Sequence, residues 1–540
     1  MKKFALALLL SFSPLLASLQ AQTNTPPSTS PASSATPTAT GANSRLGINL
    51  NGVIDWGTEF PFSDLFHQAR PWISQKEGEP WGKGPALELD EHGWVKKLEL
   101  NCRVQTPVFS GPAAHIPEGP WTLLYEGEGT ITLWPSNINT VISDEPGKIV
   151  FKTAPDSNGD CNVQIVVNSS NPDNYVRNIH VLWPGTETTW KDNPFRSEFT
   201  DRWQSFNTIR FMDWMSTNGS TVKEWADRPK SDDAFWTSKG IPLETIIDLA
   251  NRTHTNPWIN IPHLASDDYV HQFAKYVKEH LDPKLKVHIE FSNEVWNGMF
   301  QQARWAQDKA KELKIGDASR PWEGAAVFYV QRSLEIFKIF EQEFGGTDRL
   351  VRIIAWQAAA TEGWTDGRLL SQPGVDGHVD ALAIAPYITF CVPPESHPGK
   401  VGADQVSTWT LDQLFDELQK TDLPQSIKWM ETQKKFADKH GLKLMAYESG
   451  QHLVGISGGE NNDAMTHLFN DANRDPRMGA LYTQYLDAWK NAGGDTMCLF
   501  DSTGKWGKWG SWGLLEYYNQ TAADEPKYKA VIDWNAKNRR

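Results

Sequence analysis

The sequence predicts an α/β fold: a (β/α)8 TIM barrel with a β-rich, sandwich-like insertion between its first and second strands. Short apolar, β-branched runs alternate with long stretches of helical periodicity over most of the chain, and eight such runs can be counted. This alternation is typical of a parallel sheet with crossover helices. An open doubly wound sheet is the alternative, but no glycine-rich phosphate turn follows any run. We therefore favour the closed barrel.

Of the eight predicted barrel strands, one precedes the β-rich insertion and seven follow it. They cover residues 45–53, 206–214, 255–263, 286–294, 350–356, 379–387, 442–449 and 495–502. The segments between them are amphipathic, as in "AAVFYVQRSLEIFKIFEQEF", where Val330, Leu334 and Phe337 recur at helical spacing. The first strand falls within 45–56, and 197–540 completes the barrel.

Residues 57–196 are too many for one crossover helix. Their runs, such as "WTLLYEGEGTITLWP" and "CNVQIVVNSS", alternate in polarity and are bounded by turn residues. They predict a small β-sandwich that is either structural or sugar-binding. Between two runs, "DSNGD" predicts a hairpin tip. Its acids lack the distal bidentate carboxylate of a calcium loop, so no metal is expected there.

The N-terminus reads "MKKFALALLLSFSPLLASLQAQ", in which two lysines precede a short apolar run that Pro14 interrupts. This pattern predicts a signal peptide over 1–21, and hence a secreted or periplasmic protein. Residues 22–44 are rich in Pro, Ser and Thr and predict a linker. No later run has the length of a membrane span, so none is expected.

Composition narrows the classes of partner. The net charge of −14, without a basic stripe, argues against nucleic acid. The four cysteines leave a Cys102–Cys161 disulfide open, while Cys391 and Cys498 are expected to be free and buried. No Cys-x-x-Cys or His-Glu-x-x-His spacing occurs, and no metal or cofactor is predicted. The 25 tryptophans favour an aromatic core and sugar-stacking surfaces equally.

In a TIM barrel, the active site lies at the carboxyl ends of the strands. Polar and aromatic residues collect at these predicted ends, and two glutamates stand out at strands four and seven. The candidates are Arg210, His263, Asn293, Glu294, Trp296, Tyr387 and Glu448, with Trp506, Trp509 and Trp512 in the loop after strand eight.

The stretch "VHIEFSNEVWN" sets the orientation of strand four. Because side chains alternate along a strand, Val287, Ile289 and Phe291 should face the helices. Glu290 and Glu294 should then face the barrel axis. A buried acid needs a partner, so we expect Glu290 to pair with Arg210 in a structural role, one layer below Glu294.

These segments resemble clan A glycoside hydrolases, particularly the cellulase- and mannanase-like family five. "IEFSNEV" is similar to that clan's Glu-x-x-Asn-Glu-Pro signature, with Val295 in place of proline, and "MAYESG" resembles its strand-seven nucleophile segment. On strand six, "APY" stands in place of the common His-x-Tyr. The exact family stays open.

The resemblance implies Glu294 as acid/base and Glu448 as nucleophile. It further implies that Asn293 binds the sugar 2-hydroxyl and that Arg210 and Tyr387 flank the nucleophile. His263 matches the clan's strand-three histidine, and one of Trp506, Trp509 and Trp512 matches its strand-eight tryptophan. Trp296 and the loop that carries these three tryptophans offer stacking surfaces for sugars.

The sequence thus predicts a retaining glycoside hydrolase that cleaves β-glycosidic bonds in an oligo- or polysaccharide. The many tryptophans favour endo action. The main alternative is a non-catalytic carbohydrate-binding protein on a degenerate barrel. An esterase that uses Ser457 is a weaker one: "GISGG" matches the Gly-x-Ser-x-Gly elbow, but no strand–serine–helix context is expected. The sugar, the linkage and the oligomeric state are left open.

Overall fold

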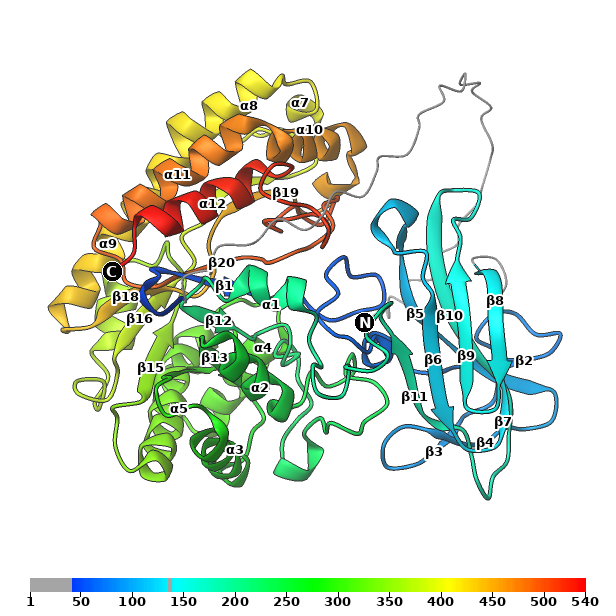
Figure 1. Ribbon diagram of the computed structural model, residues 1–540. Coiled ribbons are helices and arrows are strands. Elements are labelled where there is room, and N and C mark those ends of the chain that lie inside the picture. Colours follow the sequence, from blue (N-terminus) through cyan, green and yellow to red (C-terminus); the bar gives the residue numbers. More distant parts are fainter. Residues whose placement is uncertain (1–40, 135–137) are drawn as a thin grey trace. The chain divides into compact units, whose positions relative to one another are not determined.

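The computed structural model describes residues 41–134 and 138–540. Its central element is a closed barrel of eight strands in the order β1-β12-β13-β14-β15-β16-β18-β20 (Figure 1). Neighbours in the barrel are parallel, and β20 returns to pair with β1 through Leu46↔Met497. The predicted TIM barrel is therefore confirmed, and the open doubly wound sheet is wrong.

The barrel strands are short and each lies within one of the eight predicted runs. They are β1 (Leu46–Asn49), β12 (Thr208–Arg210), β13 (Asn256–Ile261), β14 (Val287–Phe291), β15 (Leu350–Ala355), β16 (Ala381–Ile384), β18 (Lys443–Ala446) and β20 (Met497–Leu499). Most of the predicted runs continue past the last ladder pair, because the loops that follow the strands are also buried. Those loops build the mouth of the barrel.

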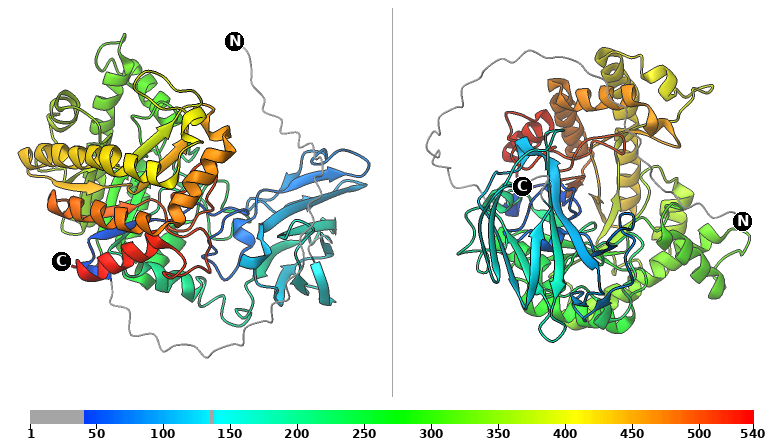
Figure 2. Two further views of the ribbon diagram at one scale, coloured as in Figure 1. Left: turned by 90° about the horizontal axis from the view of Figure 1, so that it is seen from above. Right: turned by 90° about the vertical axis from the view of Figure 1, so that its right-hand side faces the viewer.

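Helices follow or precede the strands. They are α1 (Ser197–Trp203), α2 (Leu243–Thr253), α3 (Asp267–His280), α4 (Gln301–Glu312), α5 (Pro321–Phe344), α6 (Glu362–Trp364), α7 (Ala403–Val406), α8 (Leu411–Glu417), α9 (Leu423–Lys439), α10 (Asp463–Arg474), α11 (Pro476–Asn491) and α12 (Pro526–Lys537). Figure 2 shows α9, α11 and α12 running side by side along the barrel. Their ends are set locally: Ser266 caps α3 by accepting from the Tyr269 N–H, and Pro526 begins α12.

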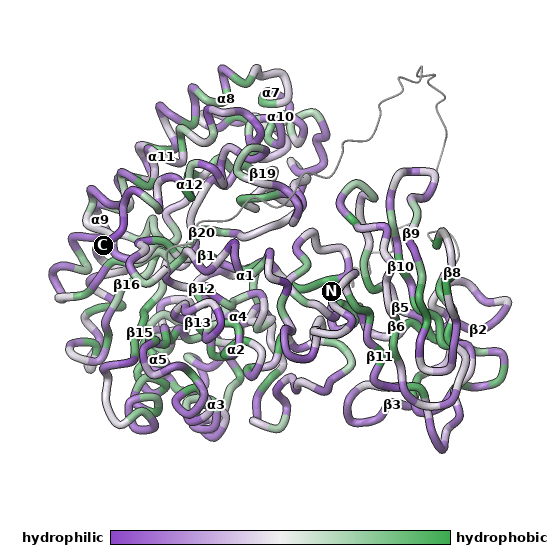
Figure 3. Tube along the Cα trace, in the orientation of Figure 1, coloured by the Kyte–Doolittle hydropathy of each residue, from purple (hydrophilic) through white to green (hydrophobic). Residues whose placement is uncertain are grey.

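The alternation predicted for β14 is confirmed. Val287, Ile289 and Phe291 are buried in the large cluster that joins the strands to the helices. On the opposite face, the His288 ring stacks on Trp258 and the Glu290 side chain is buried. In Figure 3 hydrophobic segments mark many of the barrel strands, whereas many connecting loops are hydrophilic. The alternation of side chains along β14 is what directs charged side chains such as Glu290 to the barrel axis.

Between β1 and β12, the chain forms two four-stranded antiparallel sheets. One has the order β2-β5-β10-β7 and the other β11-β6-β9-β8. The strands are β2 (Ile73–Lys76), β5 (Cys102–Pro112), β6 (Trp121–Glu126), β7 (Gly129–Leu133), β8 (Ile138–Glu145), β9 (Lys148–Thr153), β10 (Asp160–Ser170) and β11 (Arg177–Leu182), with a small pair β3 (Glu88–Leu89) and β4 (Val95–Lys97). Residues of both sheets share one core, including Phe109, Trp121 and Val163. The sheets therefore pack as a sandwich.

One expectation about this sandwich is wrong, and one question that the sequence left open is answered. The "DSNGD" segment is not a hairpin tip, because β9 pairs with β6 and β8 while β10 pairs with β5 and β7, so the turn crosses between sheets. Cys102 and Cys161 do not form a disulfide. In the β5–β10 ladder Cys161 faces Gly111, nine positions from Cys102, which corresponds to about 30 Å along an extended strand.

Residues 41–44 belong to the folded part rather than to the predicted linker. Gly41 donates its N–H to the Gln204 carbonyl, and a Cβ at this position would lie 1.9 Å from the Phe206 carbonyl oxygen. The Ser44 hydroxyl donates to Asn535. A glycine is thus required where the chain enters the barrel. The predicted signal peptide and residues 22–40 lie outside the described residues.

Two further strands, β17 (Ile388–Val392) and β19 (Gln451–Gly455), pair in parallel just beyond Tyr387 and Glu448. They extend the sixth and seventh strand segments past the barrel ladder and fix the backbone on either side of these two residues. Within the described residues, no helix combines the length and the apolar character that a membrane crossing requires.

Candidate active site

The floor of the site is a buried ion pair between Arg210 and Glu290. Arg210 ends β12 and donates from Nε and Nη2 to the two oxygens of Glu290, at 3.0 and 3.1 Å. Neither side chain is more than 1% exposed. Trp258 and Asn260 of β13 donate further hydrogen bonds to Glu290 Oε2, at 2.8 and 2.9 Å. The pairing expected from the sequence is confirmed.

Arg210 also connects this floor to the mouth. Its Nη1 donates to Glu448 Oε1 at 3.0 Å and to Asn49 at 3.1 Å, and its Nη2 donates to Asn293 at 2.9 Å. Burial opposes the guanidinium charge, but the Glu290 and Glu448 carboxylates outweigh it and raise the pKa of Arg210. A permanent cation therefore lies against Glu448.

Glu448 lies just beyond β18, with 7% of its surface exposed. Besides Arg210, it accepts a hydrogen bond at Oε2 from the Tyr387 hydroxyl, at 3.0 Å. A donor thus lies on each oxygen, and one of the two donors is cationic.

Glu294 lies in the turn after β14 and has a different environment. The backbone there is strained, with φ of +59° at Ser292 and +42° at Glu294, values that non-glycine residues rarely adopt. Its oxygens accept hydrogen bonds from the Tyr447 hydroxyl at 3.0 Å and from the Asn297 amide at 2.9 Å. Both donors are neutral.

Burial and, after it, the negative charge of Glu448 raise the pKa of Glu294 to about 7, against the opposing hydrogen bonds from Asn297 and Tyr447. Glu294 is therefore largely protonated in mildly acidic solution. A neutral acid beside a carboxylate that is held by a cation is the arrangement that separates a proton donor from a nucleophile.

A second line of acids adjoins Glu448. Burial and the charge of Glu448 raise the pKa of Asp213 to about 7. Burial, followed by the charges of Asp213 and Glu59, raises the pKa of Asp501 to about 8. The sequence did not single out Asp501, although it follows strand eight directly. These acids make the region around the nucleophile candidate strongly anionic above neutral pH.

A pocket of about 430 Å³ begins at the residue after Glu294. Val295 and Trp296 line it together with Trp322, Trp356 and Trp364 and the side chains of Gln307 and Gln357. Trp356 and Trp364 stack at 6.2 Å, and Trp322 is 49% exposed. Several indole faces and two amides around an open hollow suit a flat, hydroxyl-bearing ring. The predicted position of Trp296 at the mouth agrees with this pocket.

The three late tryptophans have three different environments. Trp509 is 68% exposed, and the Lys508 ammonium lies over its ring. Trp512 donates from Nε1 to His452 at 2.9 Å, and the His452 ring packs against Tyr387, the partner of Glu448. The expected exposure of Trp506 is wrong. It is buried, because Lys527 of α12 lies over its ring and its N–H bonds within the loop.

Two other sequence candidates are not joined to the glutamates. Among the described residues, neither ring nitrogen of His263 has a hydrogen-bond partner, and its ring packs edge-on against Trp305. Ser457 is exposed, and only a short 3-10 turn (Gly459–Asn461) follows it in place of the helix of an esterase elbow. The esterase hypothesis has no structural basis at this serine.

The sequence missed several partners of the site, Asn260 and Asn297 among them. Asn49, at the end of β1, donates to the Tyr447 carbonyl and accepts from Arg210. Tyr447 donates to Glu294, and Trp258 donates to Glu290. Tyr447 directly precedes Glu448, which was the available signal. In the described part of the chain, two groups of His and Asp side chains are close enough to share a metal ion. Neither group contains a residue of this site.

Comparison with known proteins gives distant structural likeness only. No family model and no curated protein matches the chain. A 4-O-α-L-rhamnosyl-β-D-glucuronidase from Fusarium oxysporum has a TM-score of 0.37 and 11% identity, over 61% of this chain and 60% of that enzyme. The chain therefore spans less than two thirds of that enzyme's length.

A cellulase and an endoglucanase give similar values. A Bacteroidetes-affiliated GH5 cellulase has a TM-score of 0.34 and 11% identity, over 63% of this chain and 83% of that one. A GH5-4 broad specificity endoglucanase from Clostridium longisporum has a TM-score of 0.35 and 12% identity, over 66% and 90%. At such TM-scores, the likeness carries no argument about family or activity.

Proposed function

We propose that this protein is an exported, retaining glycoside hydrolase of the clan A type that cleaves β-glycosidic bonds in an oligo- or polysaccharide. One observation carries the proposal: two glutamates at the carboxyl ends of strands four and seven interact, yet have opposite surroundings. Glu294 has neutral donors and a pKa raised to about 7 by burial and by Glu448, whereas Glu448 lies against the Arg210 cation.

This asymmetry supports the following roles. Glu448 attacks the anomeric carbon while Glu294 gives its proton to the glycosidic oxygen, which releases the leaving sugar and forms a covalent glycosyl-enzyme. Glu294, now a carboxylate, takes a proton from water, which then attacks the same carbon and frees Glu448. Two inversions restore the original configuration. This route needs the two carboxyls about 5 Å apart.

Neighbouring groups assist these steps. The Arg210 fork and the Tyr387 hydroxyl hold the Glu448 carboxylate in one orientation. The Asn293 side chain uses its oxygen for Arg210 and one amide proton for Asn218, which leaves its second amide proton to donate to a sugar hydroxyl. Preorganised donors of this kind stabilise charge that develops in the transition state.

The tryptophan pocket supports endo action. Because Glu294 protonates the leaving oxygen, the departing sugar must lie on the side of Glu294, where Val295 and Trp296 begin the pocket. A hollow with several indole faces beside the leaving group suits a continuing chain rather than a small alcohol. We therefore propose that the substrate is an oligo- or polysaccharide with a sugar chain on the leaving-group side, as endo action requires.

The test is a hydrolysis screen against a panel of β-linked glycans, with the anomeric configuration of the first product read by proton NMR. The proposal expects release of sugars with retained configuration. Glu448→Gln should abolish it, and Glu279→Gln, an exposed control on α3, should not. Binding of a glycan without cleavage would favour the carbohydrate-binding alternative, and inverted product would overturn the double displacement.

A further inference from the structure

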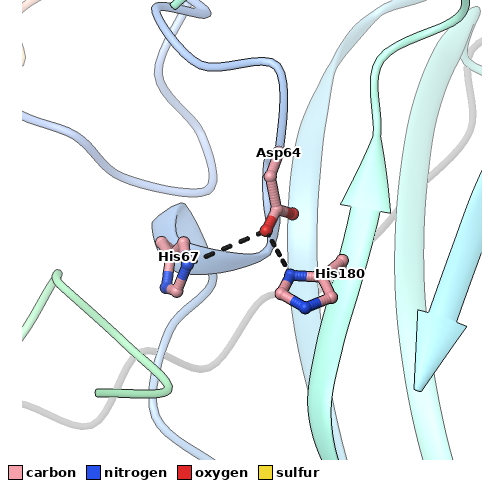
Figure 4. A group of neighbouring side chains, drawn as sticks. All are labelled: Asp64, His67 and His180. Atoms are coloured by element: carbon pink, nitrogen blue, oxygen red, sulfur yellow. Dashed lines mark hydrogen bonds and ion pairs between the residues drawn. The ribbon is translucent and has the colours of Figure 1, made fainter. Parts of the chain in front are cut away.

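Three side chains outside the site converge on one point (Figure 4). Asp64 and His67 come from the segment between β1 and β2, and His180 comes from β11. Asp64 Oδ2 lies 2.7 Å from His180 Nδ1 and 3.7 Å from His67 Nε2. The three atoms all lie within 4.8 Å of one another. Two imidazole nitrogens and one carboxylate oxygen thus share a small volume.

The spacing fits a tetrahedral ion. Zinc binds histidine nitrogen and carboxylate oxygen at about 2.0–2.2 Å, so two ligands of one tetrahedral ion lie about 3.3 Å apart. The separations of Asp64 Oδ2 from the two ring nitrogens, 2.7 and 3.7 Å, bracket that value. Shifts of a few tenths of an ångström would equalise them. A calcium or magnesium ion fits less well, because both prefer sets of oxygen ligands.

The three side chains are held in place by their surroundings. Asp64 Oδ1 accepts the backbone N–H groups of Phe66 and Val181, at 3.0 and 2.9 Å, which leaves Oδ2 directed at the two rings. The His67 ring stacks on the Trp236 ring with 4.1 Å between centroids. The His67 backbone carbonyl accepts a hydrogen bond from the Trp236 backbone N–H. Such supporting contacts orient ligands in metal sites.

The site is also reachable. The side chains of His67 and His180 are 16% and 25% exposed, so an ion can enter and a water can complete its coordination. Asp64 and His180 are 116 positions apart in the chain, which is why no ligand spacing announced them in the sequence.

We infer that Asp64, His67 and His180 bind a zinc-class divalent transition-metal ion. The ion would join β11 to the segment that carries Asp64 and His67, and it would be structural, since none of its ligands belongs to the group around Glu294 and Glu448. This inference does not depend on the proposed hydrolase activity, and its failure would leave that activity intact.

Zn2+ titration by calorimetry tests it on the full purified protein after dialysis against EDTA. One ion per chain is expected to bind, and His67→Gln and His180→Gln should each weaken binding by at least about 100-fold, because each removes a ligand. Zn2+ should raise the unfolding temperature of the wild type and not of these variants. His92→Gln is the matched control, since His92 lies near Asp232 and Asp233 in a second, more exposed group.

Several results would overturn the inference. They are no saturable Zn2+ binding by the wild type, equal binding by all three variants, and loss of binding in His92→Gln alone. A measurement on the wild type alone uses Co2+, whose visible absorption is strong in tetrahedral coordination. It does not depend on any variant folding. A weak, octahedral-type spectrum from the wild type would also contradict the site, and Ca2+ should neither bind nor compete.

Discussion

Glu290 and Glu294 lie four residues apart in one stretch of chain, and burial raises the pKa of both, yet their hydrogen-bond donors differ in charge and number. Glu290 is 1% exposed and receives two bonds from Arg210 and one each from Trp258 and Asn260. Glu294 receives two bonds from neutral donors, and burial together with Glu448 raises its pKa to about 7. The comparison teaches that the charge and number of donors, rather than residue type, separate a support from a reacting group.

The largest expected effect is on catalysis at Glu294. Glu294→Gln removes the proton donor and should lower kcat by about 10²–10⁴-fold on natural glycans. The loss should be much smaller on an aryl glycoside with an acidic phenol, since that leaving group departs without a proton. Equal losses on both substrates would contradict the role of Glu294 as acid.

At Glu290, the effect should fall on stability. Glu290→Gln leaves the Arg210 guanidinium buried with one carboxylate fewer, which should cost about 3–5 kcal/mol of the free energy of unfolding. Urea unfolding measures it, with Glu294→Gln as the matched variant four residues away. If the two variants lost the same stability, the distinction between support and reacting group would be wrong.

The acids near Glu448 predict a dependence of stability on pH. Burial and Glu448 raise the pKa of Asp213 from 3.8 to about 7, so between these values the folded state binds more protons than the unfolded state. Stability from this residue is therefore lost as the pH rises through that window. At pH 8, Asp213→Asn should be more stable than the wild type by about 1–3 kcal/mol.

Urea unfolding of Asp213→Asn and the wild type at pH 4 and at pH 8 checks this sign. At pH 4 both forms carry a largely neutral side chain when folded, so the difference should nearly vanish. A stabilisation of the same size at both values of pH would show that the charge of Asp213 is not its cause.

The smallest effect is expected at Tyr387. Tyr387→Phe removes one neutral hydrogen bond to Glu448 and leaves the Arg210 bond, so kcat should fall by about tenfold, equivalent to about 1.4 kcal/mol. Trp512→Phe, which breaks only the bond to His452 further out, is the control and should change kcat less. A larger loss at Trp512 would mean that the loop, and not the tyrosine, positions Glu448.

Local pattern was sufficient to predict the barrel and its central glutamates. The barrel strands lie within short runs rich in apolar residues, alternation alone placed Glu290 inward, and Glu294 and Glu448 lie two or three residues past the ends of β14 and β18. The misses have a common physical origin. Trp506 is buried by Lys527, and Asn49 of β1 bonds to Tyr447, which follows β18 two strands away in the barrel. Each depends on which distant segments meet, and no local pattern encodes that.

Covalent trapping with a 2-deoxy-2-fluoro glycosyl fluoride tests the central claim most directly. The fluorine slows both steps and the fluoride leaving group speeds the first, so the glycosyl-enzyme accumulates and peptide mass spectrometry locates it. A label on Glu448, absent in Glu448→Gln, is the predicted result. A label on Glu294, Asp213 or Glu362, or none on an enzyme that turns over the parent sugar, would contradict it.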